Sequence, residues 1–560
     1  MLARCNSLMR GHSAVRLQII EAIATLLNHD FVPIIPLRGS ISASGDLTPL
    51  SYIAGAVEGN SDIYLDCGIA DGKREILSAD KALRRAGLVP TTMMPKEGLG
   101  LMNGTAVSCA AGTLALHETQ YLVLASQVLT AMCTEALRGS SDNFHPFISN
   151  TRPHSGQREV AQNVARQLKQ SKLVVGKDAK TAGLYQDRYA LRTASQWIGP
   201  QIEDLSLAAK QLGTELNSTT DNPLIDAEEE MVHHGGNFQA ASVTSAMEKA
   251  RLCLQMLGKL MFAQTSELIN PMLNGILPPN LCFDDPGLSF TFKGVDINMA
   301  SYQSELAFLA NPVSSHVQSA EMHNQAVNSL ALISARYTLD AVELVSLMTA
   351  TYLYTVCQAL DLHVLYLEYY ALIERDAKAV FTQTFQNVFS GSDLENTWDD
   401  VLDAIRSGLS TMKTQDTPQR ARGTAESTVI PITKALLRQS RTGDGGRLSS
   451  MQSWVDQVTE IITTSIRSTR LRFASSEEGG GPTTMDYLGH GSATMYRYIR
   501  HDLGIPLHKG LVEHPTYPDC DREGVEIAKA EKLTIGTRIS KIYAELRSGG
   551  MRNILVESLT

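Results

Sequence analysis

The tripeptide Ala43-Ser44-Gly45 is the stretch of this 560-residue sequence that first suggests chemistry done by the backbone itself. Every residue from Gly39 to Gly45 is small except Ile41, and Thr48-Pro49 follows shortly after. Because Thr is a good N-cap and Pro is favoured at the first helical position, we expect a helix to begin there. The tripeptide would then lie in the field of a helix N-terminus, which favours nearby negative charge by about 0.3–1 kcal/mol.

Two well-known kinds of site do not fit this stretch, whereas a plain turn does. Neither GxGxxG nor GxxxxGK[ST] is present here, which disfavours a phosphate-binding loop. No GxSxG surrounds Ser44, so the nucleophile elbow of a serine hydrolase is excluded. Considered alone, the segment is typical of a Ser/Gly turn followed by a helix cap.

Other polar residues also allow a purely structural interpretation when they are taken one at a time. Asn103-Gly104-Thr105 could form a turn cap, and Arg192 could form a surface salt bridge. Asp221-Asn222-Pro223 is typical of a turn. Glu321 and Gln325, spaced i and i+4, could be an exposed helical pair.

Taken together, the segments resemble the aromatic amino-acid ammonia-lyases and their histidine relatives, in the same order along the chain. GSISASGDLTPLSYIAG (39–55) is similar to the segment in which Ala-Ser-Gly of that family cyclises to a methylidene-imidazolone (MIO). Five further segments carry the resemblance over nearly the whole chain: KEGLGLMNGTAVS (96–108), QDRYALRTASQWIGPQIE (186–203), NSTTDNPLID (217–226), HHGGNFQA (233–240) and FKGVDINMASYQSELAFLANPVSSHVQSAEMHNQAVNS (292–329).

The resemblance implies a ring built from the tripeptide. The nitrogen of Gly45 would attack the carbonyl of Ala43, and the Ser44 hydroxyl would leave, so that two waters are lost. The backbone must fold tightly for this closure, which Gly permits. The resulting exocyclic methylene is an electrophile that no ordinary side chain supplies. We expect no diffusible cofactor and no metal, because the sequence shows no nucleotide-binding loop and no cluster with metal-ligand spacing.

The resemblance also implies roles in removing ammonia from an aromatic amino acid. Arg192 would hold the substrate carboxylate with a bidentate fork. Asn103 and Asn222 would bond the carboxylate and MIO carbonyl oxygens, as an oxyanion hole does. Tyr189 and Gln186 would position the amine and the MIO, and Tyr189 joins the tripeptide among the predicted catalytic residues.

The remaining predicted substrate-binding residues surround the ring and the amine of the substrate. Leu99 and Phe238 would line the aryl pocket, and Glu321 could accept a proton from the amine. The resemblance adds three further substrate-binding residues: Lys293, Asn324 and Gln325.

The start of the sequence departs from the family pattern. MLARCNSLMRGHSAVRLQIIEAI matches an interior helix of the family, upstream of which lies a mobile loop whose Tyr serves as general base. The residues that sort phenylalanine from tyrosine lie there too. No Tyr precedes Tyr52 in this sequence. We therefore expect either an incomplete chain or a protein that has lost its base and lid.

The elements that must position these residues are mostly helices. Apolar residues recur at helical spacing in four segments: 13–28, 105–137, 240–269 and 299–372. The last is interrupted at Pro312. Such long helices, rich in Ala, Leu and Met, indicate a large bundle packed against identical subunits. Strand candidates are few and short, for example 62–66.

The predicted fold class is mainly α, with a large helical-bundle core of the ammonia-lyase/fumarase type, a partial MIO domain and an inserted shielding domain. After about residue 370, Gly-rich breaks such as RTGDGGR (441–447) separate shorter helices at 396–412 and 449–471. The tail is again helical, notably at 526–546. Four parts are predicted: the remainder of the MIO domain (1–104), the helical core (105–365), the shielding insertion (366–490) and a C-terminal return to the core (491–560).

Composition narrows the partners and the compartment. The chain is 43% hydrophobic and 19% charged, which suits a large core. A net charge of −10 without a Lys/Arg block argues against nucleic acid or an anionic membrane as partner. No signal peptide and no membrane span of ~18 apolar residues is found. Eight scattered cysteines without CxxC indicate reduced core thiols in a cytoplasmic protein, with neither a zinc site nor a disulfide frame.

The family resemblance implies a homotetramer that deaminates L-phenylalanine to trans-cinnamate for phenylpropanoid or related secondary metabolism. The insertion and the segment GPTTMDYLGHGSATMYRYIRHDLGIPLHKGLVEHP resemble fungal members of the family, so L-tyrosine stays open as a second substrate. Two alternatives also stay open. One is an MIO-dependent phenylalanine aminomutase, and the other is a non-catalytic truncated homologue that lacks the base-bearing lid loop.

Overall fold

A computed structural model describes residues 1–70, 72–175, 186–389, 391–438, 446–475, 480–520, 524–525, 527 and 532–560. The chain divides into two compact units. Unit 1 comprises Met1–Val123, Pro200–Gly258 and Gln303–Val345, and unit 2 comprises Leu124–Gly199, Lys259–Tyr302 and Ser346–Thr560. The predicted four-part division of the chain stays a prediction.

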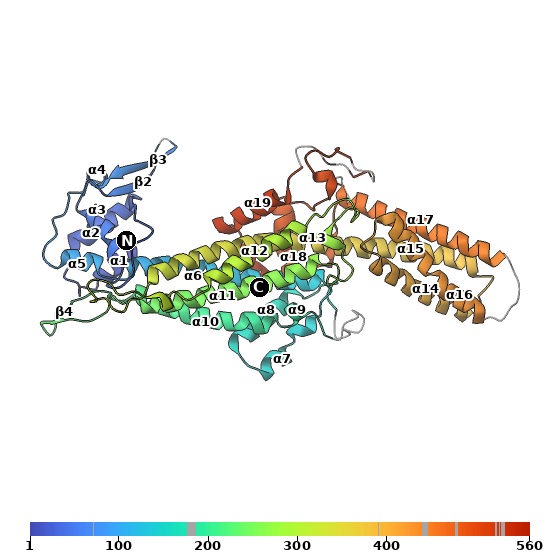
Figure 1. Ribbon diagram of the computed structural model, residues 1–560, viewed down its shortest axis with the longest axis horizontal. Coiled ribbons are helices and arrows are strands. Elements are labelled where there is room, and N and C mark those ends of the chain that lie inside the picture. Colours follow the sequence, from blue (N-terminus) through green and yellow to red (C-terminus); the bar gives the residue numbers. More distant parts are fainter. Residues whose placement is uncertain are drawn as a thin grey trace. The chain divides into compact units, whose positions relative to one another are not determined.

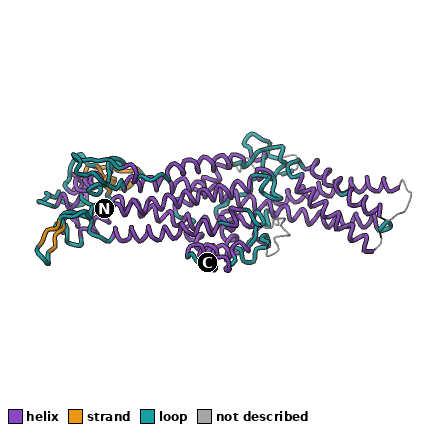
Figure 2. Tube along the Cα trace, turned by 60° about the horizontal axis from the view of Figure 1, so that its bottom comes forward, coloured by secondary structure: helices purple, strands orange, loops and turns teal. Residues whose placement is uncertain are grey.

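The chain is mainly helical with few short strands, which confirms the predicted fold class (Figures 1 and 2). The helices are α1 (Leu2–Leu8), α2 (Leu17–Asn28), α3 (Leu47–Val57), α4 (Ala79–Arg85), α5 (Glu97–Met102), α6 (Ala106–Ala136), α7 (Pro146–Thr151), α8 (Ser155–Gln167), α9 (Tyr189–Arg192), α10 (Ala194–Leu216), α11 (Ala241–Ile269), α12 (Lys293–Leu309), α13 (Ala331–Phe385), α14 (Gly391–Thr411), α15 (Thr417–Ser427), α16 (Val429–Arg438), α17 (Gly446–Ala474), α18 (His490–Arg497), α19 (Ile535–Ser548) and α20 (Arg552–Leu559). The strands are β1 (Val32–Pro33), β2 (Tyr64–Ala70), β3 (Lys73–Ser78), β4 (Leu224–Asp226) and β5 (Met231–His233).

The interruption at Pro312 in the helical segment predicted over 299–372 is confirmed, but the break is much longer than predicted. Helix α12 ends at Leu309, and α13 begins only at Ala331. Pro312 ends the first helix, and the backbone at residues 321–323 has positive φ angles, which an α-helix does not allow. Helix α13 then continues for 55 residues, past the predicted end at 372.

Other helix predictions hold to within a few residues, and the exceptions have local causes. Helix α11 matches its prediction almost residue for residue. Helix α2 begins at Leu17 instead of residue 13, because Arg16 is extended and its N–H donates to Glu97. In the tail, α19 covers only Ile535–Ser548 of the predicted 526–546 helix, and residues 526 and 528–531 lie outside the described part, as do 441–445 of the Gly-rich break.

The first part of unit 1 builds a small core beneath a three-stranded antiparallel sheet of order β1-β2-β3. Val32 pairs with Asp66, and Leu65 pairs with Leu77. Ile19, Ile23 and Leu26 of α2 follow one another at i, i+4 and i+7 and are buried, as helical periodicity requires. Leu50 and Ile53 of α3 join the same cluster. This core fixes α3, whose first turn follows the tripeptide.

In unit 2, helices α14 to α17 pack together (gold to orange in Figure 1), and Phe381 of α13 contacts Trp398 of α14 and Trp454 of α17. Gly408 of α14 lies so close to Thr424 of α15 that a Cβ at position 408 would come within 2.9 Å of the Thr424 Cγ2. Trp454 of α17 is fully buried, and its ring centroid lies 5.5 Å from that of Phe381 and 6.0 Å from that of Phe385. Its indole N–H donates to the Thr428 Oγ1 at 2.8 Å.

The eight cysteines all lie in the described part of the chain, and seven of them are buried. Cys520 is exposed, which contradicts its assignment to the core. Among the described residues, no helix combines the length and apolar character needed to cross a membrane.

The Trp454 cluster generates a first prediction. Replacing Trp454 with Ala removes a buried aromatic side chain and should destabilise the packing of α14–α17 by about 3–5 kcal/mol. Hydrogen exchange measured by mass spectrometry should then show amides in these helices exchanging roughly 100 times faster or more. Trp454→Phe keeps most of the ring and should give a smaller effect. Equal exchange in Trp454→Ala and wild type would contradict the role given to this cluster.

Candidate active site

The tripeptide lies in unit 1 on a turn whose backbone is pressed against another backbone. Ala43 and Gly45 are buried, Ser44 is half-buried, and Gly45 has a φ of +71°, in the left-handed region. Gly45 and Gly104 form a parallel bridge, and the Asp46 N–H donates to the Gly104 carbonyl at 2.7 Å. A Cβ on Gly45 would lie only 2.2 Å from that carbonyl oxygen. Glycine is therefore required at this position by both φ and space.

Asp46 closes the turn and is the N-cap of α3, so the prediction of Thr48 as the cap is wrong. The Asp46 carboxylate accepts from the Ser42 hydroxyl at 2.9 Å and from the Ser108 N–H at 2.7 Å. Burial raises the pKa of this carboxyl above its ordinary value, although the hydrogen bonds from Ser108 and Ser42 act in the opposite direction. The Ser42 hydrogen bond thus fixes the turn internally, and the Ser108 hydrogen bond attaches it to the first turn of α6.

A second segment, just before α13, covers the other side of the turn. The Ser329 hydroxyl donates to the Ser42 carbonyl at 2.9 Å, and the Leu330 N–H donates to the Ile41 carbonyl at 3.0 Å. The Gln325 Nε2 lies 3.4 Å from the Ser44 Oγ, to which it donates. The structure therefore brings Gln325, alone among the predicted substrate-binding residues, into hydrogen-bond contact with the tripeptide.

Glu321, Asn324 and Gln325 lie in a loop, so the reading of Glu321 and Gln325 as a helical pair is wrong. Glu321 has a φ of +52°, and the Gln325 N–H donates to the Ala320 carbonyl across the loop. Asn324 donates to the Glu321 carboxylate at 3.4 Å. Glu321 and Asn324 are exposed, and in the described residues neither forms a hydrogen bond with the tripeptide.

Asn103 and Asn222 meet each other directly. The Asn103 Nδ2 donates to the Asn222 carbonyl at 3.0 Å and to the Asp221 Oδ1 at 3.2 Å. The Asn222 Oδ1 accepts from the Gly235 N–H at 2.7 Å, which ties it to the loop after β5. Asn103 directly precedes Gly104, so its amide is fixed beside the tripeptide. Phe238 is half-buried after the same loop, and Leu99 on α5 is exposed.

Arg4 and Lys96 hold this pair of loops, and the sequence analysis missed both. The buried Arg4 guanidinium donates to the Thr220 carbonyl at 2.9 Å, to the Asn103 carbonyl at 3.2 Å and to the Gly100 carbonyl. The Lys96 amine lies 2.7 Å from the buried Asp221 carboxylate. No local pattern marks either residue, because their partners lie about a hundred residues or more away along the chain.

The remaining predicted residues belong to unit 2. Arg192 ends α9 and is half-buried, with its guanidinium 5.6 Å from the centre of the Tyr189 ring. Within the described residues it forms no ion pair. Tyr189 is 70% exposed, and Gln186 is exposed as well. Lys293 opens α12, is exposed, and its amine lies 4.5 Å from the centre of the Phe290 ring.

One group outside the predicted site has donor atoms close enough to share a metal ion. In the β4–β5 hairpin, ligand atoms of Asp226, Glu229 and His233 lie within 4.8 Å of one another. Glu229 and His233 are exposed, and the Asp226 Oδ1 already accepts from the Glu228 and Glu229 N–H groups. We assign no chemistry to this group.

A sequence model for the family described as aromatic amino acid lyase matches residues 1–382. The chain belongs to the aromatic amino acid lyase family. Membership confirms the resemblance and makes the protein a carbon–nitrogen lyase.

Relatives of this lyase are similar over almost its entire length. Phenylalanine ammonia-lyase lenB of Aspergillus lentulus is 49% identical, over 99% of this chain and 76% of its own length. An L-β-phenylalanine-forming phenylalanine aminomutase of Talaromyces islandicus is 44% identical, over 99% of this chain and 76% of its own. The crystal structure of phenylalanine ammonia-lyase from Rhodosporidium toruloides matches with a TM-score of 0.92 and 41% identity, over 100% of this chain and 82% of that chain.

Two glycines on either side of Asn103 allow a matched test of the backbone contact. A Cβ at Gly104 would lie 2.3 Å from the Arg4 Nη1 and 2.4 Å from the Thr220 carbonyl oxygen, whereas a Cβ at Gly98 meets nothing within 4 Å. Gly104→Ala should therefore destabilise the lyase by about 2 kcal/mol or more. Gly98→Ala, inside α5, should be neutral or stabilise it by up to about 1 kcal/mol. Urea unfolding measures both, and equal effects would contradict the proposed crowding.

The ion pair that fixes α5 should give a pH-dependent contribution to stability. The Arg16 side chain holds the pKa of Glu97 down at about 2, helped by the Met94 and Arg16 N–H groups. Since the unfolded value is about 4.3, this contribution is fully present above pH 5 and is lost as the pH falls toward 2. Glu97→Gln should thus lower the unfolding midpoint at pH 7 but progressively less between pH 5 and pH 3. A difference that stays constant over this range would contradict the assignment, and Arg16→Gln should reproduce the same trend.

Proposed function

We propose that this lyase converts L-phenylalanine to trans-cinnamate and ammonia without an oxidant, with L-tyrosine open as a second substrate. One observation carries the proposal beyond family membership: Ala43-Ser44-Gly45 forms a buried turn that has a left-handed glycine and a hydrogen-bonded Ser44 hydroxyl. The reaction is difficult because the β-hydrogen is not acidic and an amine is a poor leaving group. Ordinary acid–base residues do not make the amine a good leaving group.

The residues present fit an MIO ring built from this tripeptide. Closure brings the Gly45 nitrogen to the Ala43 carbonyl carbon, and the positive φ of Gly45 suits so tight a turn. Gly104 leaves the space beside it free of a side chain, and Gln325 contacts the Ser44 hydroxyl that must leave as water. The ring, once formed, supplies an electrophilic methylene that makes the substrate amine a better leaving group.

Arg192 binds the substrate carboxylate in this proposal. Its guanidinium is half-buried and has no ion-pair partner in the described part of the chain, so its fork is available to a carboxylate. Stacking near the Tyr189 ring restricts its orientation. Tyr189 and Gln186 orient the amine. A held carboxylate places the amine and the β-carbon in a defined position, which lowers the barrier through orientation.

The other residues recognise the ring, the amine and the carbonyl oxygens. Phe238 and Leu99 line the aryl pocket, Glu321 accepts a proton from the amine, and Asn103 and Asn222 face the carboxylate and ring oxygens. The Asn222 Oδ1 accepts from the Gly235 N–H, which orients the Asn222 Nδ2 to donate without reorganising, the condition for electrostatic stabilisation. The Asn103 Nδ2 already donates to the Asp221 Oδ1 and the Asn222 carbonyl, so it holds Asn222 in place. The remaining substrate contacts are assigned to Lys293, Asn324 and Gln325.

We further propose that the protein is a homotetramer, because unit 1 exposes apolar side chains on three long helices, and that it acts in the cytoplasm. Leu114 of α6 is 65% exposed, Leu252 of α11 is 53% exposed, and Phe308 of α12 is 77% exposed. Apolar residues repeated along bundle helices favour packing against other copies of the chain. Light scattering at several concentrations measures the number of copies.

Mass and activity measured on the same samples test the ring. Wild-type chains should weigh two waters less than the sequence mass and release cinnamate. Ser44→Ala should show the full mass and lose at least about 1,000-fold in rate, equivalent to about 4 kcal/mol of the barrier. Ser51→Ala is the matched control, because its hydroxyl only donates to the Thr48 carbonyl within α3. Retained activity in Ser44→Ala would exclude the proposed electrophile.

A second candidate function is favoured by the 44% identical aminomutase. An aminomutase uses the same electrophile but returns the ammonia to the β-carbon. Chromatography of the products decides between them: cinnamate with free ammonia supports the lyase, whereas β-phenylalanine supports the aminomutase. A chain that loses two waters yet forms neither product would instead support the non-catalytic alternative.

A further inference from the structure

Helix α9 of unit 2 carries Tyr189 and Arg192 but is too short to fix its own orientation. It has four residues, and its backbone hydrogen bonds include those from the Arg192 and Leu191 N–H groups to the Arg188 carbonyl, at 2.9 and 3.1 Å. Leu191 is fully buried and attaches one face of the turn to the core. Isolated helices this short are unstable in water, so tertiary contacts must hold α9 in place.

Asp187, two residues before the helix, attaches it to the segment that follows α6. Its side chain is 4% exposed. The Asp187 Oδ2 accepts from the Ser140 N–H at 2.8 Å and from the Asn143 Nδ2 at 2.7 Å, and the Oδ1 accepts from the Arg188 N–H at 2.7 Å. A Cβ on Gly139 would lie 2.8 Å from the Asp187 Oδ2, so the carboxylate lies directly against that segment.

Arg188, the N-cap residue of α9, connects the ends of two long helices. Its Nη1 donates at 3.1 Å to the carbonyl of Leu137, which directly follows α6. Its Nε donates at 3.0 Å to the carbonyl of Leu273, in the loop after α11. The donors of a guanidinium are held in a fixed planar geometry, so two such bonds restrict where the main chain of Arg188 lies.

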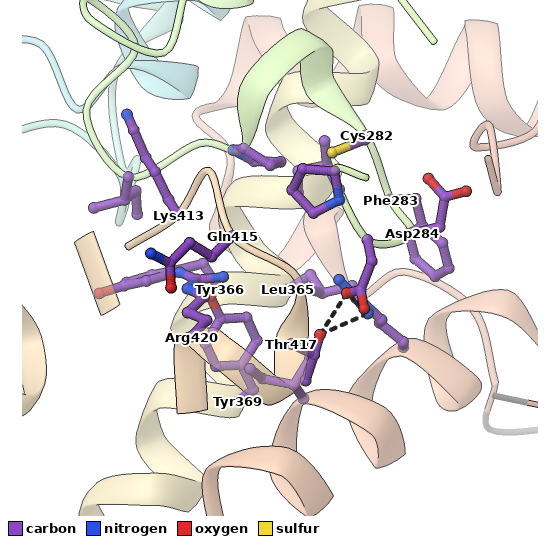
Figure 3. Close-up of a pocket in the computed structure, with 17 residues that line it drawn as sticks. Cys282, Phe283, Asp284, Leu365, Tyr366, Tyr369, Lys413, Gln415, Thr417 and Arg420 are labelled. Carbon is purple, nitrogen blue, oxygen red and sulfur yellow. Dashed lines mark hydrogen bonds and ion pairs between the residues drawn. The ribbon is translucent and has the colours of Figure 1, made fainter. Parts of the chain in front are cut away.

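Lys413 holds the loop after α11 from another side (Figure 3). It lies between α14 and α15, and its side chain extends away from Thr417. The Lys413 amine donates to the Asn274 Oδ1 at 2.7 Å and to the Gly275 carbonyl. Burial lowers the pKa of Lys413 to about 8, and the nearby charge of Arg188 contributes to this shift. The loop that accepts from Arg188 is thus itself held in place.

We propose that Asp187 and Arg188 are positioning residues for substrate binding, because together they determine where α9 places Arg192. The inference rests on the proposed function, in which Arg192 binds the substrate carboxylate. A guanidinium bonds a carboxylate with both of its parallel N–H groups only in a narrow range of orientations. A displacement of about 1 Å in such a contact can cost roughly 100-fold in rate. Asp187 and Arg188 act through α9 and need no contact with the substrate.

Kinetics with L-phenylalanine test this role. Arg188→Gln removes the guanidinium that joins Leu137 to Leu273. It should raise KM at least about 10-fold while kcat changes less than about 5-fold, because carboxylate binding contributes equally to the ground state and the transition state. Arg138→Gln is the matched control, since Arg138 is exposed and directly precedes Gly139. It should leave both constants within about 2-fold of the wild type. Every chain should keep the mass deficit of two waters.

A double-variant cycle separates positioning from a general loss of structure. The dissociation constant of trans-cinnamate, measured by titration calorimetry, requires no turnover. Arg188→Gln alone should raise this constant about 10-fold, whereas adding it to Arg192→Gln should raise it by no more than roughly 3-fold, because the side chain through which it acts is already missing. Two losses that multiply would show that Arg188 only supports the fold, and would overturn the proposal.

Asn143→Ala is a milder second variant that keeps both proposed positioning residues. It removes one donor to the Asp187 carboxylate and should raise KM roughly 3- to 10-fold. If the wild type releases cinnamate but KM and the dissociation constant stay unchanged in both variants, only the positioning role is overturned. A wild type that binds trans-cinnamate without any turnover contradicts the proposed function, and the binding cycle still decides the positioning role. A wild type that does neither overturns both.

Discussion

The contact between the backbones of Gly45 and Gly104 is the constraint on which the arrangement in unit 1 depends. Neither position has room for a side chain, and the Asp46 N–H joins the two segments by donating to the Gly104 carbonyl at 2.7 Å. Each glycine gives up conformational freedom on folding, roughly 0.5–1 kcal/mol more than alanine would. The contact brings Asn103 and Ser44 close together, because Asn103 directly precedes Gly104 and Ser44 directly precedes Gly45. The two glycines thus set the distance between the two segments, and the polar groups come from their neighbours Ser44 and Asn103.

Around this contact, buried charges are satisfied mostly by carbonyl groups. Arg4 is always protonated, so it must find acceptors wherever it is buried. It finds them in three backbone carbonyls: that of Gly100 in α5, that of Asn103 at the end of α5, and that of Thr220 in the loop after α10. Such a guanidinium adds little net stability because removing it from water is costly. Its rigid fork instead fixes the spacing of the loops that carry Asn103 and Asn222. The Lys96–Asp221 pair acts on the same loops.

The sequence was most informative where structure depends on neighbours along the chain. Helix α11 could be predicted almost to the residue because its apolar periodicity is uninterrupted, and the family motifs located the tripeptide. The cap of α3 was misplaced because Thr48 is a good cap by propensity, whereas Asp46 is held by a distant N–H, that of Ser108, and by the nearby Ser42 hydroxyl. The loop before α13 was read as helix because its departure from helical geometry comes from left-handed residues at 321–323, which periodicity does not reveal.

The candidate site shows the same division more sharply. Arg192 and Asn222 lie in segments that resemble the family, so they could be predicted from the sequence. Arg4 and Lys96 could not, because their importance arises from partners brought close only by folding.

The burial of most thiols allows local opening of the fold to be measured by thiol labelling. Seven sulfur atoms are covered by the fold and one, at Cys520, faces solvent. A maleimide dye added to intact molecules would attach once per chain, and each further adduct would report that a particular region had opened. Counting labels by mass would therefore map which parts of the molecule loosen first, with no residue altered.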